Sequence, residues 1–378
     1  MSQLFRHPAR PCVLVTVVLM TLSTTCSAQD AETIQQTYQP RLDAAVDRGL
    51  EYLAGQQIDP NAAAAMGQPE LAGSFREPNS PGNTGVTSLA IMAFLAKGHL
   101  PGRGKYGAVI DRGVDYVLSQ QLDNGLLICR KQTGRTSGLM YEHSIATLLL
   151  SEVSGMLDAT RQKKLDDVLS KALLVLLQAQ KVPKSEANKG GWRYTPGTTD
   201  SDLSLTGWSI MALRAAKLNG AAIPDEHIEM AVSYILNCHE DNGGFSYMPG
   251  MRNPTASMTG VALLCLELCG EHGNEDCEAA GEFILSRPPR MTSPDGRPDH
   301  HRYYAYYYCG QAMFQLGGKY WNEFAPQMYE ALLPAQNDDG SWTYPDQSFP
   351  YNTTYPTAMS ILTLTVSARQ LPIYQREE

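Results

Sequence analysis

Two kinds of apolar pattern alternate along the chain. In the first, apolar residues recur at spacings of three and four, which is typical of a helix that buries one face. In the second, nearly every position is apolar and charges are scarce, so such a helix must be buried on several sides. The one-faced pattern is clearest at 44–57, 108–121, 227–239 and 324–336. The segments that are apolar all round are 85–98, 141–155, 203–220, 255–270, 303–318 and 355–368.

A short glycine-containing turn separates the two kinds of helix and recurs along the chain. Its clearest copy is QNDDGSW, from Gln336 to Trp342. Related turns lie at 121–127, 239–245, 188–192 and 72–75, and a degenerate copy lies at 293–296. A two-helix unit that cannot bury its apolar face alone must stack on its neighbours. Six such units predict an all-α fold, a closed (α/α)6 toroid whose inner helices enclose a central cavity at one end.

The first 28 residues have the composition of a secretory signal peptide. They contain two arginines and no acid, then the apolar run VLVTVVLMTL and small residues that end at Ala28. Cys26 follows Ser-Thr-Thr, a poor match to a lipid-attachment site, so we expect ordinary cleavage after Ala28. We predict a signal peptide over 1–28, an N-terminal linker over 29–40 and one toroid over 41–378. No later stretch is apolar enough to span a membrane, so we expect an exported protein, periplasmic or secreted.

The net charge limits the classes of partner that the protein can bind, and the cysteine spacings limit the disulfides that it can form. The net charge is −9, and it becomes −11 once Arg6 and Arg10 leave with the signal peptide. An acidic chain without a basic cluster excludes nucleic acid as a partner. An oxidising compartment permits disulfides, but the cysteine spacings do not match a disulfide framework. Buried free thiols are therefore favoured. The cysteines of the mature chain are Cys129, Cys238, Cys265, Cys269, Cys277 and Cys309.

The spacing Gln-x3-Gly-x-Trp at Gln336, Gly340 and Trp342 resembles the repeat of the prenyltransferase and squalene-cyclase superfamily. Segments 191–216, 140–156, 300–321 and 371–376 support the resemblance, which covers nearly all of the mature chain. The chain looks most similar to exported single-ring members known only as prenyltransferase or squalene-oxidase repeat proteins. The resemblance implies a toroid and a structural role for the Gln and the aromatic residue. It implies no established substrate.

The stretch TDSDLSLTG raises the question of a catalytic acid. Triterpene cyclases, which the chain resembles, protonate an alkene with the middle acid of Asp-x-Asp-Asp; here Asp200 and Asp202 match the first two acids and Leu203 replaces the last. An alkene needs an acid that is kept neutral yet gives up its proton readily. The alternative is that Asp202 caps a helix, which would favour its ionised form. In the catalytic hypothesis Asp202 is the acid, Asp200 assists and His143 orients it.

The other chemistries of related toroids lack their residues in this sequence. Protein prenyltransferases need a zinc site with an Asp-x-Cys pair, whereas Cys238 and His239 have no further ligands nearby, so no metal site is expected. No acidic diphosphate motif or basic pocket is present, and 268–272 lacks the glutamine that a thioester requires. We therefore expect no metal and no cofactor.

Tyrosines supply the remaining candidates for the cavity. The chain has 19 Tyr against 8 Phe, and a tyrosine offers both a stacking face and a hydroxyl. For each tyrosine, packing between helices is the alternative interpretation. The candidate cavity residues are Tyr141, Tyr194, Tyr303, Tyr304, Tyr307 and His301.

Three functions remain open from the sequence. The first is an enzyme that performs acid–base chemistry on an isoprenoid-like apolar ligand. The second is a non-catalytic toroid that binds a lipid, a glycan or a peptide. The third is a polysaccharide lyase, which would be supported if Arg193 or another cation faced the cavity beside the acids. An apolar cavity wall would favour a lipid, and a wall of tyrosines and carboxylates would favour a glycan or peptide.

Overall fold

The computed structural model describes residues 14–375, apart from 79, 81, 133–137, 294, 295, 298 and 345–351. Residues 1–13 of the predicted signal peptide and two positions of the degenerate turn at 293–296 lie outside the described residues. Within the described part of the chain the regular elements are all helical, which confirms the predicted fold class. None of the helices there has the length and apolar character needed to cross a membrane.

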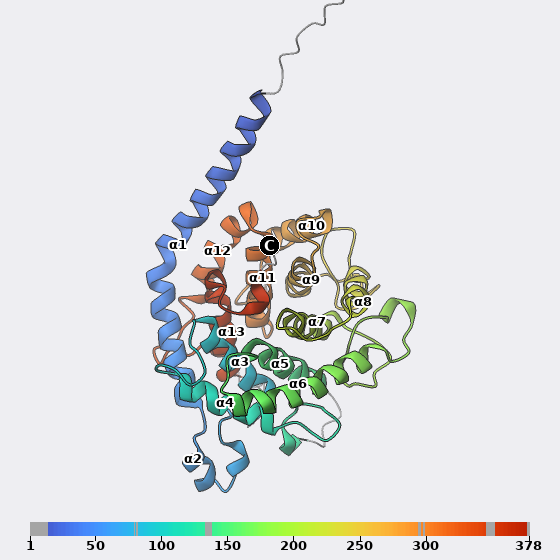
Figure 1. Cartoon of the computed structure of the whole chain (residues 1–378). Coiled ribbons are helices and arrows are strands. Elements are labelled where there is room, and N and C mark those ends of the chain that lie inside the picture. Colours follow the sequence, from blue (N-terminus) through green and yellow to red (C-terminus); the bar gives the residue numbers. More distant parts are fainter. Residues whose placement is uncertain are drawn as a thin grey trace, which may run out of the picture.

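Six inner helices form a closed ring (Figure 1). Each packs against the next in chain order, and the last, α13, packs back against the first, α3. Most of their residues are buried, as expected for helices that are apolar all round. The inner helices are α3 (Thr84–Ala96), α5 (Leu139–Val153), α7 (Leu203–Leu218), α9 (Ala256–Leu268), α11 (Arg302–Leu316) and α13 (Thr354–Leu364).

Six outer helices surround this ring and bury one face each. They are α1 (Leu14–Gln56), α4 (Gly107–Ser119), α6 (Ala159–Gln180), α8 (Asp225–Leu236), α10 (Glu275–Ser286) and α12 (Gly318–Leu332). The outer ring closes as well, because α1 packs against α12. Short elements fill the connections: α2 (Pro60–Ala65) and the 3-10 turns η1 (Pro69–Leu71), η2 (Arg130–Gln132), η3 (Glu186–Asn188), η4 (Val366–Ala368) and η5 (Pro372–Tyr374).

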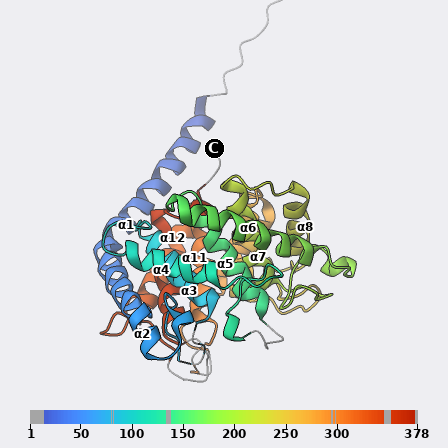
Figure 2. The same cartoon turned by 60° about the horizontal axis from the view of Figure 1, so that its bottom comes forward.

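Helix α1 is much longer than the other outer helices. Its N-terminal part projects away from the toroid in both views (Figures 1 and 2), and the predicted linker 29–40 lies within it. Ile34 and Tyr38 pack against the core, and the Tyr38 ring lies 5.1 Å from that of Tyr329 on α12. The described side chains of α1 that contact the toroid therefore follow the predicted cleavage site.

In four of the repeats the turn joins one outer helix to the next through a glutamine side chain. The amide of Gln336 donates to the carbonyl of Gly340 in its own turn and to that of Ala45 on α1, across 2.9 and 2.8 Å. Gln57, Gln121 and Gln180 make the same pair of bonds in their repeats. Gly340 has φ of 88°, and a Cβ there would lie 2.5 Å from the carbonyl oxygen of Arg48, so this turn requires glycine. The turn is thus a structural clamp that also closes the ring.

The far end of the ring, where the inner helices finish, is filled by the C-terminal segment. The backbone N–H of Ile373 in η5 donates to both carboxylate oxygens of the buried Glu152. The hydroxyl of Tyr374 shares a 2.5 Å hydrogen bond with that of Tyr307. The six cysteines between Cys129 and Cys309 are free thiols in this fold, and all but Cys269 are fully buried.

Candidate functional site

A cavity of about 560 Å³ lies where the inner helices begin. Its volume is within the range of pockets that hold small molecules. Apolar atoms provide most of its wall. The described residues that line it are Asn83, Gly85, Val86, Leu89, Gly138, Tyr141, Glu142, Ile145, Tyr194, Ser204, Trp208, Tyr247, Met251, Asn253, Thr255, Ser257, Met258, His301, Tyr304 and Tyr355.

The repeat places equivalent residues at equivalent heights in this wall. In four repeats a threonine of the inner helix accepts from the backbone N–H of the turn residue. These threonines are Thr87, Thr206, Thr259 and Thr357. The residue two positions before each one lines the cavity: Gly85, Ser204, Ser257 and Tyr355. Tyr141 and Tyr304 line it from the other two inner helices, so one level of the wall is largely hydroxyl groups.

An apolar layer lies one helical turn below these hydroxyls. Leu89, Ile145 and Trp208 each follow a wall residue by four positions and share its face of the helix. The Trp208 ring stacks on Tyr307, with centroids 5.6 Å apart and planes at 13°. The rings of Trp208 and Tyr308 pack edge to face, with centroids 5.3 Å apart. The floor of the cavity is therefore apolar, made of aliphatic side chains and an indole that packs against two buried tyrosines.

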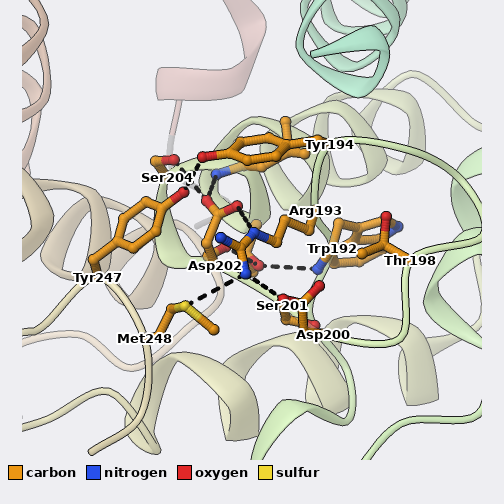
Figure 3. A network of polar contacts seen from close by, with 12 residues as sticks. Trp192, Arg193, Tyr194, Thr198, Asp200, Ser201, Asp202, Ser204, Tyr247 and Met248 are labelled. Atoms are coloured by element: carbon orange, nitrogen blue, oxygen red, sulfur yellow. Dashed lines mark hydrogen bonds and ion pairs between the residues drawn. The ribbon is translucent and has the colours of Figure 1, made fainter. Parts of the chain in front are cut away.

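Asp202 is the N-cap residue of α7, and its carboxyl lies among Ser204, Arg193 and the pair of Tyr194 and Tyr247 (Figure 3). Its side chain is fully buried and does not line the cavity. Oδ1 accepts from the backbone N–H of Leu205 at 2.9 Å and from the hydroxyl of Ser204 at 2.6 Å. Oδ2 has no hydrogen-bond partner among the described residues. The cap interpretation is thus correct for one oxygen and leaves the other unexplained.

Opposing influences act on the Asp202 carboxyl. Burial raises its pKa, because a charge is costly away from water. The hydrogen bonds from Ser204 and Leu205, the nearby Tyr247 hydroxyl and the Arg193 guanidinium act in the opposite direction, and the pKa remains raised. Burial thus favours the neutral acid, while these partners would stabilise the carboxylate left after proton transfer.

Ser204 connects Asp202 to the cavity. Its Oγ lies 2.5 Å from the hydroxyl of Tyr141, which lines the wall from α5. A second pair of hydroxyls, on Tyr194 and Tyr247, lies beside the carboxyl at a mutual distance of 2.6 Å (Figure 3). The buried acid therefore has hydroxyl groups between it and the ligand space.

Arg193 lies between the two acids and outside the wall. Its guanidinium bonds to Asp200, and its Nε lies 3.6 Å from Oδ2 of Asp202. It also lies over the rings of Tyr194 and Tyr247, 5.0 and 5.9 Å from their centroids. Asp200 holds this cation from its partly exposed side and is not a lining residue. Arg193 is beside the acids but does not line the cavity, and no lysine or arginine is among the described lining residues, so the condition for a lyase is not met.

The structure does not bring His143 to the acids. The ring is fully buried against the turn of its own repeat, where Nδ1 accepts from the N–H of Leu127 at 3.1 Å. Its Nε2 lies 3.1 Å from the carbonyl oxygen of Ala172 on α6, and burial lowers the pKa of the ring to about 4. His143 thus occupies the place of the turn-holding threonine in the other repeats. The suggested role of His143 in orienting Asp202 has no geometric basis.

The cavity candidates divide into two groups. Tyr141, Tyr194, Tyr304 and His301 line the cavity, as predicted for a wall residue. Tyr303 does not: its hydroxyl donates to the carbonyl of Thr343 at 3.0 Å. Tyr307 lies under the floor, bonded to Tyr374.

Glu142 also lines the cavity, but its carboxylate is used by the fold. Oε2 accepts from the backbone N–H groups of Thr84 and Cys129 at 3.1 and 3.0 Å. Its carboxylate therefore holds the start of α3 and the segment that follows the turn at 121–127. Across the described residues, no group of three His, Cys, Asp or Glu side chains is arranged to hold a metal ion.

Sequence reasoning missed Ser204, Trp208, Tyr247 and Tyr355. Three of these could have been found from the repeat. Ser204 and Tyr355 precede a turn-holding threonine by two positions, and Trp208 follows Ser204 by one helical turn. Tyr247 comes from the loop after the next turn, and no periodicity in the sequence indicates which way that loop folds.

The family model for the prenyltransferase alpha-alpha toroid domain matches residues 110–340. This is more than half of the chain, so the protein belongs to this family, as the sequence resemblance indicated. No curated protein matches the sequence.

Solved structures show the same fold at low identity. The type II terpene cyclase MstE from Scytonema has a TM-score of 0.55 at 14% identity, over 88% of this chain and 100% of that one. A protein from Actinoplanes has a TM-score of 0.54 at 15% identity, over 86% and 99%. D-mannose isomerase has a TM-score of 0.58 at 12% identity, over 86% and 97%. At these identities the likeness is one of fold.

Proposed function

We propose that this protein is an exported toroid that takes an isoprenoid-like ligand into its central cavity and acts on it with Asp202 as the acid. The observation that carries the proposal is the position of Asp202. Equivalent N-cap positions in α3 and α9 are filled by Asn83 and Thr255, so capping does not require a carboxyl group there. Of the helices α3, α7 and α9, only α7 has an ionisable N-cap residue, and that residue lies behind the cavity wall.

The environment of Asp202 fits the demand made on an alkene-protonating acid. The missing third acid of the cyclase motif is replaced by Leu203, which is buried. Burial raises the pKa of the carboxyl and so favours its neutral form, and Arg193 together with the two bonds to Oδ1 would stabilise the carboxylate once the proton has left. The aromatic floor at Trp208 offers a π-face to a developing carbocation.

The composition of the wall favours an apolar ligand over a glycan. The floor is hydrocarbon and indole, and Oε2 of Glu142 accepts two hydrogen bonds from the backbone. A variant of the Scytonema cyclase has been solved with geranylgeranyl dihydroxybenzoate as substrate, with a TM-score of 0.53 to this chain at 14% identity. That protein binds an isoprenoid in the same fold. The sugar isomerase among the structural neighbours keeps a glycan as the second candidate.

Deuterium incorporation tests the proposal. The purified protein is incubated in D2O with farnesol, geranylgeraniol and squalene, and the products are examined by mass spectrometry. Protonation of an alkene followed by loss of a proton gives an isomer that carries one deuterium in place of hydrogen. We expect this product from the wild type and none from Asp202→Asn. Equal incorporation by both proteins would exclude Asp202 as the acid.

The proposal of export rests on the sequence of residues 1–28. The described contacts of α1 with the toroid begin at Ile34, so cleavage after Ala28 would retain them. N-terminal sequencing of the protein from fractionated cells tests this. We expect Gln29 as the first residue, in the periplasm or the medium; an uncleaved chain in the cytoplasm would contradict export.

A further inference from the structure

Asp202 cannot reach a ligand directly, because it is fully buried behind the cavity wall. We propose that its proton leaves through Ser204 and is delivered by the hydroxyl of Tyr141, which makes Tyr141 the residue that protonates the ligand. This inference rests on the proposed function and adds two residues to it.

Two short hydrogen bonds define this route. Ser204 Oγ lies 2.6 Å from Oδ1 of Asp202 and 2.5 Å from the hydroxyl oxygen of Tyr141. Both lengths are those of good O–H···O bonds. Ser204 and Tyr141 line the cavity, and they come from the adjacent helices α7 and α5. The route therefore begins at a buried acid and ends at the ligand space without a break.

The proton balance along this route is closed. The Ser204 hydroxyl, which donates to Oδ1 of Asp202 in the structure, turns in this step to accept the proton of the neutral acid and to donate its own to Tyr141. The proton of Tyr141 passes in turn to an alkene carbon. The electron pair of the double bond forms the new C–H bond and leaves a carbocation on the ligand. Asp202 ends as a carboxylate beside Arg193, while Ser204 and Tyr141 end neutral. Loss of a proton from the carbon next to the cation and the reverse transfer restore the starting state.

The second pair of hydroxyls is a less complete route. Tyr194 and Tyr247 bond to each other, but Oδ2 of Asp202, the free oxygen, accepts no hydrogen bond within the described part of the chain. Oδ2 instead faces Arg193, with Nε at 3.6 Å. This pair therefore supports the wall and the cation, and the Ser204–Tyr141 pair carries the proton.

The chain provides a matched control for Ser204. Ser144 and Ser209 form a second hydroxyl pair between α5 and α7, with their oxygens 2.9 Å apart. Ser209 follows Ser204 by five residues on α7, and Ser144 follows Tyr141 by three on α5. Ser144 and Ser209 are both fully buried, and neither lines the cavity. Ser209→Ala thus removes the same group from the same helix without touching the route.

The test uses geranylgeraniol in D2O and measures both the rate of deuterium incorporation and the dissociation constant. We expect Tyr141→Phe and Ser204→Ala to lose about 100-fold or more in rate, the range for a positioned proton donor. Their dissociation constants should stay close to that of the wild type. Ser204→Thr, which restores a hydroxyl, should regain rate, and Ser209→Ala should keep it.

Each other result has a defined meaning. Full rate in Tyr141→Phe, or an equal loss in Tyr194→Phe, overturns the route while leaving Asp202 as the acid. A loss of affinity with unchanged rate in Tyr141→Phe also overturns it, because Tyr141 would then only bind the ligand. No incorporation by the wild type from any of the three probes rejects the proposed function and this inference together. Melting temperatures of all variants identify any that fail to fold.

Discussion

Asp202 occupies in α7 the place that Asn83 occupies in α3. Each is the N-cap of its helix, and each accepts from the backbone N–H three residues further on, at 2.9 Å for Leu205 and 2.8 Å for Val86. The repeat therefore shows that an amide can do the structural work of this position. Structure and chemistry at Asp202 can be separated by the choice of substitution.

Asp202→Asn should keep the fold, whereas Asp202→Ala should lose the cap. We expect the alanine variant to lose about 1 kcal/mol of unfolding free energy, the usual value of an N-cap, and the asparagine variant to lose less. Chemical denaturation of both variants measures the difference. Equal destabilisation would mean that the charge, and not the cap, is what α7 requires.

His143 should behave as a structural residue with a strong dependence on pH. Its neutral ring is kept by the fold, with a pKa of about 4, whereas the unfolded chain has an ordinary value near 6.5. The contribution of the neutral ring to the free energy of unfolding is complete above pH 6.5. It falls as the pH drops toward 4, by about 3 kcal/mol in total.

His143→Thr checks this interpretation, because threonine holds the same turn in four other repeats. The variant should fold with a loss of about 1–3 kcal/mol and a flatter stability profile between pH 6.5 and 4. It should also bind geranylgeraniol as the wild type does. A selective loss of ligand affinity would return His143 to the functional site.

The success and the failure of sequence reasoning at this site have the same cause. The six-fold alternation of helix patterns predicts the ring, because each pattern reports how many sides of a helix are buried. The pattern does not report the rotation of an inner helix about its own axis. Because of that rotation Tyr304 faces the cavity, whereas Tyr303 and Tyr307 do not. His143 was misjudged because its equivalence to Thr206 depends on hydrogen bonds between a turn and a helix.

Glu152 should make the stability of the fold decrease as the pH rises from 4.5 to about 8. Burial raises its pKa from 4.5 to about 8. Between these values the folded protein holds a proton that the unfolded chain releases, so its stabilising effect is complete below pH 4.5 and is lost as the pH rises through 8.

Glu152→Gln removes this titration and retains an oxygen that can accept from the N–H of Ile373. We expect the free energy of unfolding of the variant to depend less on pH than that of the wild type between pH 5 and 8. Denaturation at three pH values in this window measures both slopes. Parallel slopes would show that Glu152 has an ordinary pKa.

Gln336 should contribute to closure of the ring. Its amide joins the last turn to the first outer helix through Ala45. Gln336→Leu removes three hydrogen bonds, two donated by the amide and one accepted from Arg48, and leaves two carbonyls to find other partners, so we expect a loss of about 1–3 kcal/mol. Hydrogen exchange should increase in α1 and α12 more than elsewhere. A uniform increase over the whole chain would argue against a local clamp.

The measurement that tests the central claim most directly is gentle mass spectrometry of the protein purified from its native envelope, beside Asp202→Asn. The account predicts an isoprenoid-like molecule in each, with the product in the wild type and its unprotonated precursor in the variant. An identical ligand in both proteins, or no apolar ligand in either, would contradict the claim that Asp202 acts on a molecule held in this cavity.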